Sequence, residues 1–425
     1  MARFIIKGGR PISGTFTPVG NKNAALPMLA ACLLTEEPIT LKNLPNIQDV
    51  RIMLELLADL GVDVSHGKHS VTLCAKNIRS GKPDPGLCKR VRGSVLVTGP
   101  LLTRVTKVTL PPPGGDVIGQ RRLDAHFHGF QELGVTLKSG IPYVLSCKQL
   151  SGAGILLDEA SVTATENIVM AATRARGKTT IFHAACEPHV QDLCHLLNKM
   201  GARIEGIGTN FLTIFGVRRM RGASHRIAPD YIEAGSYLAA SAATGGSLSI
   251  KGMSQKGVLP VLQHGFGRLG VDWEVNGGQW MLPARRRFTI RDNLGLVVPK
   301  IEDGIWPSFP SDLMSVAIVL ATQARGGVLF FEKMFESRMY FVDRLIEMGA
   351  KIVQCDPHRV MVVGPSRLHG SLLTSPDIRA GMALIIAALS ARGESIIDNA
   401  HMIDRGYENI DARLRALGAD IQRED

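Results

Sequence analysis

One short phrase recurs along the whole chain, and it constrains the possible folds more than any other feature. In each copy a helical segment ends in Leu or Met, a Gly follows, and alternating apolar residues then begin a strand. Six glycines stand in this place, at intervals of 73, 67, 69, 79 and 69 residues: Gly61, Gly134, Gly201, Gly270, Gly349 and Gly418. A helix that closes on a left-handed residue favours Gly there. The spacing therefore predicts six repeats of one helix–strand unit.

A second phrase precedes the first in most repeats: an apolar helix of small residues, a tight turn and a strand. It is present in five segments: Asn23 to Leu41, Ala164 to Ile181, Glu233 to Ile250, Asp312 to Phe330 and Arg379 to Ile397. A helix that is apolar on nearly all sides is buried on all sides, so each repeat should hold one inner helix, one amphipathic outer helix and covering strands. At 425 residues, six repeats divide into two pseudo-symmetric α/β domains of three, with a ligand site in the cleft between them.

Composition excludes several classes of protein. No apolar run reaches the ~20 residues of a membrane span, and the N-terminus lacks the features of a signal peptide, so we expect a cytoplasmic protein without membrane insertion. The seven cysteines form no Cys-x-x-Cys pair, which indicates reduced thiols and no metal site. The net charge of +11 fits an inert basic surface or a cleft for polyanions. We expect no nucleic-acid partner, because no basic run is interleaved with aromatic residues.

The first candidate site residues begin the first inner helix, in the run Gly20-Asn21-Lys22-Asn23. Free backbone N–H groups and the helix dipole make such a position an anion site, and Lys22 adds a full charge. The alternative is an Asn cap followed by a solvated lysine, and spacing alone favours it.

A second candidate is the loop from Pro111 to Asp124. Three prolines stiffen its approach, two glycines free its tip, and two arginines and an aspartate end it. It is either an ordinary Pro-Gly-Asp surface turn or a mobile lid that carries an acid at Asp116 and phosphate ligands behind it.

Asp312 and four arginines complete the candidates. Asp312 follows Pro310-Ser311, where it would cap a helix or act as a general base. The arginines stand near the starts of repeats: Arg92, Arg338, Arg379 and Arg405. Each alone is typical of a surface ion pair. Together with Lys22 they would converge on a ligand that carries several phosphates or carboxylates.

Six ordered segments carry a further signal: Gly20–Pro27, Gly114–Arg121, Ser161–Asn167, Pro229–Gly235, Phe309–Asp312 and Ile403–Glu408. Through them the chain resembles the UDP-N-acetylglucosamine enolpyruvyl transferases over essentially its full length. The resemblance implies an inside-out α/β barrel of six repeated units. It places repeats one to three in residues 21–229, with a mobile loop around 111–124, and repeats four to six in 230–425, closed by the N-terminal strand of 1–20.

The resemblance also implies the reaction and the residues that perform it. Lys22, Arg121 and Arg405 would hold phosphoenolpyruvate, Asp312 would accept the proton of the 3′-hydroxyl of UDP-N-acetylglucosamine, and Asp116 would protonate the methylene carbon. Loss of phosphate from a tetrahedral phospholactyl intermediate would complete the first committed step of peptidoglycan precursor synthesis, without a cofactor. The expected substrate-binding residues are Lys22, Asn23, Arg92, Arg121, Arg122, Leu123, Asp124, Ala125, Glu159, Ala160, Ser161, Val162, Asp312, Met334, Arg338, Arg379 and Arg405.

Three positions depart from the family pattern. Asp116 replaces the usual Cys, Tyr231 replaces Arg, and Arg122 replaces Pro. A model thiol has a pKa of about 8.5 and a carboxyl group about 3.9. Asp116 can therefore be an acid at neutral pH only if burial on loop closure raises its pKa, against the effect of Arg121 and Arg122.

Other functions remain open at this point. One alternative is a paralogue that adds enolpyruvyl to a different nucleotide in specialised metabolism. The other is a non-catalytic sugar-nucleotide sensor on the same scaffold. The sister enzyme that makes 5-enolpyruvylshikimate 3-phosphate is disfavoured, because its Asn-Ala-Gly-Thr phosphate motif is missing. The sequence does not indicate an oligomeric state.

Overall fold

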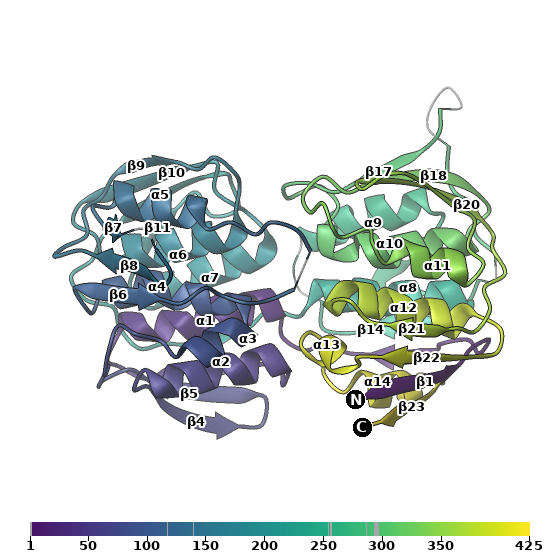
Figure 1. Ribbon diagram of the computed structural model, residues 1–425, viewed down its shortest axis with the longest axis horizontal. Helices are drawn as coiled ribbons and strands as arrows, with labels where there is room; N and C mark the ends of the chain where they lie inside the picture. The colour runs from purple at the N-terminus through teal and green to yellow at the C-terminus, as the bar shows by residue number, and fades with distance from the viewer. Residues whose placement is uncertain are drawn as a thin grey trace. The chain divides into compact units, whose positions relative to one another are not determined.

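The computed structural model describes residues 2–116, 118–138, 140–253, 255, 257–285, 287–292 and 297–425. They form two compact units, each with its own hydrophobic core (Figure 1). The first, here called the N-domain, comprises Gly20–Asp116 and Arg122–Ala228. The second, the C-domain, comprises the described residues of Met1–Val19, Val117–Arg121 and Pro229–Asp425. Val117, which belongs to the predicted lid, lies outside the described residues.

All six repeat glycines adopt the predicted left-handed conformation. Their φ angles lie between 81° at Gly270 and 100° at Gly61. The residue after each glycine donates its N–H to the carbonyl five positions earlier, as in Val62 to Leu57 at 3.0 Å and Ala419 to Leu414 at 3.1 Å. These bonds satisfy carbonyls that the helix end would otherwise leave unpaired. The prediction of six helix ends closed by glycine is confirmed.

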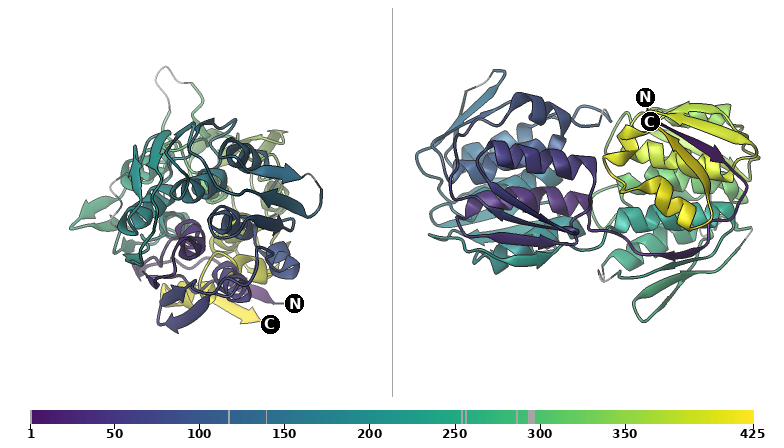
Figure 2. Two further views of the ribbon diagram at one scale, coloured as in Figure 1. Left: turned by 90° about the vertical axis from the view of Figure 1, so that its left-hand side faces the viewer. Right: turned by 90° about the horizontal axis from the view of Figure 1, so that it is seen from below.

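Helices of small apolar residues form the centre of each domain (Figure 2). In the C-domain these helices are α8 (Tyr231–Thr244), α10 (Ser311–Gln323) and α12 (Ile378–Ser390), and they pack on one another. Close packing needs small residues, since a Cβ added at Gly235 would lie 3.0 Å from the Leu313 side chain. The outer helices are α9 (Val258–Arg268), α11 (Val342–Glu347) and α14 (Ile410–Ala416), with a short α13 (His401–Asp404).

The N-domain repeats this plan. Its inner helices are α1 (Lys22–Ala30), continued by the 3-10 turn η1 (Ala31–Leu34), then η2 (Arg92–Val97) with α4 (Thr98–Leu102), and α6 (Val162–Ala172). Its outer helices are α2 (Gln48–Asp59), α3 (Pro85–Arg90), α5 (Asp124–Glu132) and α7 (Pro188–Lys199). No helix among the described residues combines the length and the apolar character needed to cross a membrane.

Sheets cover the helices, and the described residues form one sheet per repeat. In the C-domain the fourth repeat has the strand order β15 (Glu274–Asn276), β16 (Gln279–Leu282), β14 (Leu248–Ile250) and β2 (Gly14–Phe16). The fifth repeat has the order β17 (Lys300–Glu302), β18 (Gly326–Phe331), β20 (Arg359–Gly364) and β19 (Ile352–Asp356). The sixth repeat has the order β21 (Leu372–Thr374), β22 (Glu394–Asp398), β1 (Arg3–Lys7) and β23 (Asp420–Glu424). In the N-domain the first repeat has the strand order β13 (Ser224–Arg226), β3 (Ile39–Lys42), β5 (Ser70–Cys74) and β4 (Asp63–Gly67). The second repeat has the order β6 (Lys107–Leu110), β8 (Tyr143–Ser146) and β7 (Thr136–Lys138). The third repeat has the order β11 (Arg203–Glu205), β12 (Phe211–Phe215), β10 (Lys178–Phe182) and β9 (Gly154–Leu156).

Three strands complete repeats that lie far from them in sequence. Strand β1 pairs antiparallel with both β22 and β23, and β2 pairs parallel with β14. Strand β13 pairs parallel with β3. The first 16 residues therefore complete the sixth and fourth repeats, and residues 224–226 complete the first.

The second repeat differs from the other five. Its inner helix was absent from the sequence pattern, because Gly93, Gly99 and Pro100 interrupt the segment and divide it into a 3-10 turn and a short α-helix. Gly99 is needed for close contact, since a Cβ there would lie 2.3 Å from the Asn167 carbonyl oxygen. Its sheet has three strands, all paired antiparallel.

Candidate functional site

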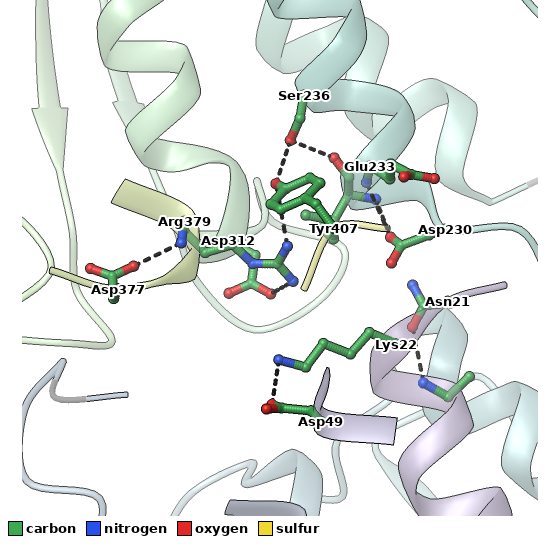
Figure 3. A network of polar contacts seen from close by, with 12 residues as sticks. Asn21, Lys22, Asp49, Asp230, Glu233, Ser236, Asp312, Asp377, Arg379 and Tyr407 are labelled. Carbon is green, nitrogen blue, oxygen red and sulfur yellow. Dashed lines mark hydrogen bonds and ion pairs between the residues drawn. The ribbon is translucent and has the colours of Figure 1, made fainter. Parts of the chain in front are cut away.

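Lys22 begins α1, and its charge is directed at a buried carboxylate. Asn21 caps the helix by accepting a 2.9 Å hydrogen bond from the Ala24 N–H. The Lys22 Nζ lies 2.8 Å from Asp49 Oδ2, and the two side chains are 10% and 4% exposed (Figure 3). The Asn cap considered above is therefore present, but the lysine is buried in an ion pair and is not solvated.

Sequence reasoning missed Asp49, although a signal was available. Asp49 stands in the first turn of α2, and it shares the buried face of that helix with Met53 and Leu56, four and seven residues further on. An acidic residue at an apolar-face position requires a buried cation, because an unpaired buried charge is strongly unfavourable. Lys22 is that cation.

The expected sugar-nucleotide residues of the N-domain lie on two helix starts. Leu123 stands at the N-cap of α5, where Asp124 and Ala125 follow, and the Arg92 Nη2 donates to the Arg122 carbonyl at 3.2 Å. Ser161 caps α6 by accepting a 3.5 Å hydrogen bond from the Ala164 N–H. On either side of Ser161, Glu159 is exposed, Ala160 is buried and Val162 is half-buried.

A buried histidine that the sequence did not reveal connects these two helix starts. His126 follows Ala125, its Nε2 lies 3.0 Å from Thr163 Oγ1, and its Nδ1 lies 3.2 Å from Asn167 Nδ2. Burial, and then the charge of Arg92, lower the pKa of His126 to about 3. The neutral imidazole therefore joins the start of α5 to the start of α6, directly after the stretches 122–125 and 159–162, through hydrogen bonds alone.

The described residues of the predicted lid are divided between the two units. Asp116 is half-buried in the N-domain, whereas the described residues 118–121, including Arg121, cluster with the C-domain. There the Gln120 N–H donates to Glu336 Oε1 at 2.8 Å, and the Ser337 N–H donates to the Ile118 carbonyl at 3.2 Å. The Gln120 amide lowers the pKa of Glu336 below its ordinary value.

Asp312 is held by two buried arginines. It lies in the first turn of α10, and Pro310 occupies the N-cap position. Its Oδ1 lies 3.1 Å from Arg338 Nη2, and its Oδ2 lies 2.8 Å from Arg379 Nη2. The arginine side chains are 4% and 7% exposed, against 25% for Asp312. Both carboxylate oxygens are thus fixed in direction, and a fraction of the group remains accessible to a substrate.

Arg379 is in turn connected to a chain of hydroxyl groups (Figure 3). Its Nη1 lies 3.4 Å from the Tyr407 hydroxyl, which lies 2.9 Å from Ser236 Oγ. Burial acts to lower the pKa of Arg379, but the Asp312 carboxylate, Tyr407 and Asp230 together outweigh it, and the net shift is upward. Arg338, Arg379 and Arg405 are all buried, so the surface ion pairs considered from the sequence do not describe them.

The remaining candidates have simpler surroundings. Met334 is exposed on the segment that leads to Arg338. Asn23 is half-buried one residue after Lys22. Tyr231, at a position where the family usually has Arg, is 2% exposed with its ring centroid 5.9 Å from that of Trp306. Among the described residues, no group of three His, Cys, Asp or Glu is placed to hold a metal ion.

A cavity of about 260 Å³ in the N-domain lies away from all these residues, where inner helices end. Its lining is Leu34, Thr35, Glu36, Arg104, Arg174, Arg218, Arg219 and Met220. Arg104 donates to the carbonyls of Leu33 and Thr35, and Arg174 to that of Val217. The end of η1 carries partial negative charge, so Arg104 is explained by helix termination, whereas Arg174 fastens the segment that follows β12.

Comparison with known proteins identifies close relatives over the full chain. The family model described as EPSP synthase (3-phosphoshikimate 1-carboxyvinyltransferase) matches residues 6–414. A Treponema denticola protein named UDP-N-acetylglucosamine 1-carboxyvinyltransferase is 50% identical over 423 residues, which cover 99% of each chain. A Bradyrhizobium diazoefficiens protein of the same name is 50% identical over 424 residues, covering 99% of this chain and 98% of the relative.

Solved structures agree on the fold. The enolpyruvyl transferase NikO from Streptomyces tendae superposes with a TM-score of 0.88 at 22% identity, covering 99% of this chain and 98% of NikO. EPSP synthase from Acinetobacter baumannii superposes with a TM-score of 0.76 at 17% identity over the full length of both chains. The predicted inside-out α/β arrangement of six repeats is therefore confirmed.

Proposed function

Because the chain belongs to the UDP-N-acetylglucosamine 1-carboxyvinyltransferase family, we propose that it transfers the enolpyruvyl group of phosphoenolpyruvate to the 3′-hydroxyl of UDP-N-acetylglucosamine. Phosphate is the second product. The reaction would be the first committed step of peptidoglycan precursor synthesis. Its supports are the full-length relatives of that name and the arrangement of charged groups around Asp312.

The observation that carries the proposal is the pair of arginines on Asp312. A general base must be ionised, oriented and within reach of the proton that it removes. The contacts from Arg338 and Arg379 favour the ionised form and fix both oxygens, while a quarter of the Asp312 side chain stays exposed. Asp312 would accept the proton of the 3′-hydroxyl as that oxygen attacks C2 of phosphoenolpyruvate.

The phosphate and carboxylate of phosphoenolpyruvate require cations. Lys22, Arg121 and Arg405 would bind them, and Asp116 would deliver a proton to the methylene carbon C3. The attack forms a C–O bond at C2, and protonation converts C3 to a methyl group, giving a tetrahedral phospholactyl intermediate. Loss of a proton from that methyl group and of phosphate from C2 restores the carbon–carbon double bond. Fixed positive charge would stabilise the negative charge that develops on the departing phosphate.

The family resemblance supplies the proposed contacts to the sugar nucleotide. In the N-domain the proposed contacts are Asn23, Arg92, Arg122, Leu123, Asp124, Ala125, Glu159, Ala160, Ser161 and Val162. In the C-domain they are Asp312, Met334, Arg338 and Arg379. The link that His126 makes between the two N-domain stretches would hold their relative positions while the nucleotide binds.

Phosphate release tests the proposal. The assay compares wild type, Asp312→Ala and a control, Asp343→Ala, with phosphoenolpyruvate and either UDP-N-acetylglucosamine or UMP as acceptor. Asp343 is a matched control because it is an exposed aspartate in the first turn of α11, in the same domain. Wild type and control should release phosphate equally with UDP-N-acetylglucosamine, and Asp312→Ala should be slower by about 10²–10⁴-fold, as for a lost general base. Release with UMP alone, or an unimpaired Asp312→Ala, would exclude the assignment.

A further inference from the structure

The carboxyl groups of Asp303 and Glu332 are buried side by side next to the segment that carries Asp312, and the proposed reaction assigns no role to either. Strands β17 and β18 run parallel, and Ile301 pairs with Phe330 and Glu302 with Phe331. Asp303 and Glu332 occupy the next position of this register, and they are 1% and 0% exposed. Two adjacent ionised carboxylates cannot both be stable in such a place.

Glu332 joins two segments that carry proposed substrate contacts. Its carboxyl oxygens accept from Ser311 Oγ at 2.8 and 3.0 Å, and Oε1 also accepts from the Phe335 N–H at 3.2 Å. Ser311 directly precedes Asp312, and Phe335 stands between Met334 and Arg338. The Glu332 carboxyl thus fastens the start of α10 to the loop that supplies Arg338.

The surroundings indicate that the two carboxyls share one proton. Asp303 Oδ1 accepts from the Lys333 N–H at 2.5 Å, but Oδ2 is buried with no hydrogen-bond donor among the described residues. A protonated Glu332 supplies that donor. Burial, followed by the hydrogen bond to Asp303, raises the pKa of Glu332 to about 9, although Arg338 opposes the shift.

The other charged groups near Glu332 are engaged elsewhere. The Lys333 ammonium lies 3.1 Å from Glu302 Oε1. His358 directs Nδ1 at the Glu332 backbone carbonyl, at 2.7 Å, and its neighbour Arg359 pairs with Asp356 at 2.6 Å. Arg338 is therefore the cation that would respond if Glu332 lost its proton.

Arg338 stands between two acids. Its Nη2 contacts Asp312, and its Nε lies 3.9 Å from Glu332 Oε2. Its Nε and Nη1 are buried and have no hydrogen-bond acceptor within the described part of the chain. A neutral Glu332 leaves the charge of Arg338 to Asp312, whereas an ionised Glu332 would compete for it.

We propose that Glu332, by sharing a proton with Asp303, is a positioning residue that keeps Arg338 directed at Asp312 during enolpyruvyl transfer. The inference rests on the proposed function, since it assigns Asp312 the role of general base. In this arrangement the protonated pair supports activity, and removal of the shared proton draws Arg338 away from Asp312.

The pH dependence of kcat tests this role through the variants Glu332→Gln and Asp303→Asn. Wild-type kcat should fall as the pH rises through about 9, where Glu332 ionises. Asp303→Asn removes the neighbouring negative charge, so the midpoint of that fall should move down by about one pH unit. Glu332→Gln keeps a neutral group of the same size, so kcat at pH 7 should stay within about fivefold of wild type and the fall near pH 9 should be lost. Glu347→Gln, at an exposed glutamate elsewhere in the C-domain, should leave the profile unchanged.

The outcomes separate this inference from the proposed function. If wild type releases phosphate but its pH profile coincides with those of Glu332→Gln and Asp303→Asn, the positioning role is wrong and the proposed function stands. If wild type releases no phosphate at any pH, both the positioning role and the proposed function are wrong. A merely structural role would lower the unfolding free energy of the variants without moving the midpoint of the profile. Should one variant fail to fold, the profile of the other decides.

Discussion

Replacing Arg379 with Met removes one of the two cations that hold Asp312 while it keeps the side chain long and apolar. The Arg379 Nη2 and Asp312 Oδ2 are 2.8 Å apart, and the two side chains are 7% and 25% exposed. Loss of one partner from a buried ion pair destabilises a protein by about 3–5 kcal/mol. Asp312 keeps Arg338 at 3.1 Å and has some access to water. We therefore expect the lower end, a loss of about 3 kcal/mol in the unfolding free energy of the C-domain.

The rate should fall as well. Without Arg379 the Asp312 carboxylate loses one of the contacts that fix its direction, and misplacement of a catalytic group by about 1 Å lowers a rate on the order of 10²-fold. We expect kcat for phosphate release to fall by about that factor. KM for phosphoenolpyruvate should change less, because the cations proposed to bind it, Lys22, Arg121 and Arg405, remain.

Both quantities are accessible to standard assays. Trp273, Trp280 and Trp306 are the three tryptophans of the chain and all belong to the C-domain, so urea unfolding followed by tryptophan fluorescence reports on that domain. Arg344→Met is the matched control, since Arg344 forms an exposed pair with Glu347 at 2.8 Å. The control should resemble wild type in stability and rate. A loss of less than about 1 kcal/mol, the range of an exposed pair, together with an unchanged kcat, would refute the role given to Arg379.

Two further predictions concern the lid and the repeats. Fosfomycin, an epoxide that alkylates the cysteine usual in the family, should leave the wild-type protein unlabelled, because the Asp116 carboxylate is a weaker nucleophile than a thiolate. The variant Asp116→Cys should restore labelling. Stoichiometric labelling of the wild-type protein, detected by mass spectrometry, would contradict this prediction. Gly134→Ala should destabilise the N-domain by about 1–2 kcal/mol, the cost of a left-handed backbone alone, because φ is 89° and no other atom lies within 4 Å of the added Cβ. Gly61→Ala should lower the unfolding free energy further, because its Cβ would lie 2.3 Å from the Asn77 carbonyl oxygen. Equal losses of unfolding free energy in the two variants, measured by urea unfolding followed by circular dichroism, would show that φ alone matters.

Local physics made the repeats predictable. Each repeat glycine closes its own helix through bonds that span only five residues, so the requirement for positive φ is visible in the chain itself. The inner helices were predictable for a similar reason, since a helix apolar on nearly all sides can only be buried. The inner helix of the second repeat escaped prediction because Gly93, Gly99 and Pro100 break the apolar pattern where contact with a neighbouring helix demands small residues.

The site was predictable in its residue types and only partly in its contacts. The positions of Lys22 and Asp312 at helix starts followed from their neighbours in sequence. Burial of Glu332 also had a local signal, because it continues the inward-facing alternation of Val328 and Phe330 in β18. That alternation indicated that the Glu332 side chain is buried, but it did not indicate which residue would be its partner.

The sequence by itself therefore determined the six repeats and the glycine at each helix end, because these depend on interactions between residues near one another in the chain, and its six ordered segments indicated the family by resemblance. Tertiary structure alone decided the partners of the charged groups: Asp49 for Lys22, Arg338 and Arg379 for Asp312, and Asp303 for Glu332. Charges attract at any sequence separation, so the pairing of buried ions is fixed only when packed helices and sheets bring distant segments together and exclude the water that would otherwise solvate them.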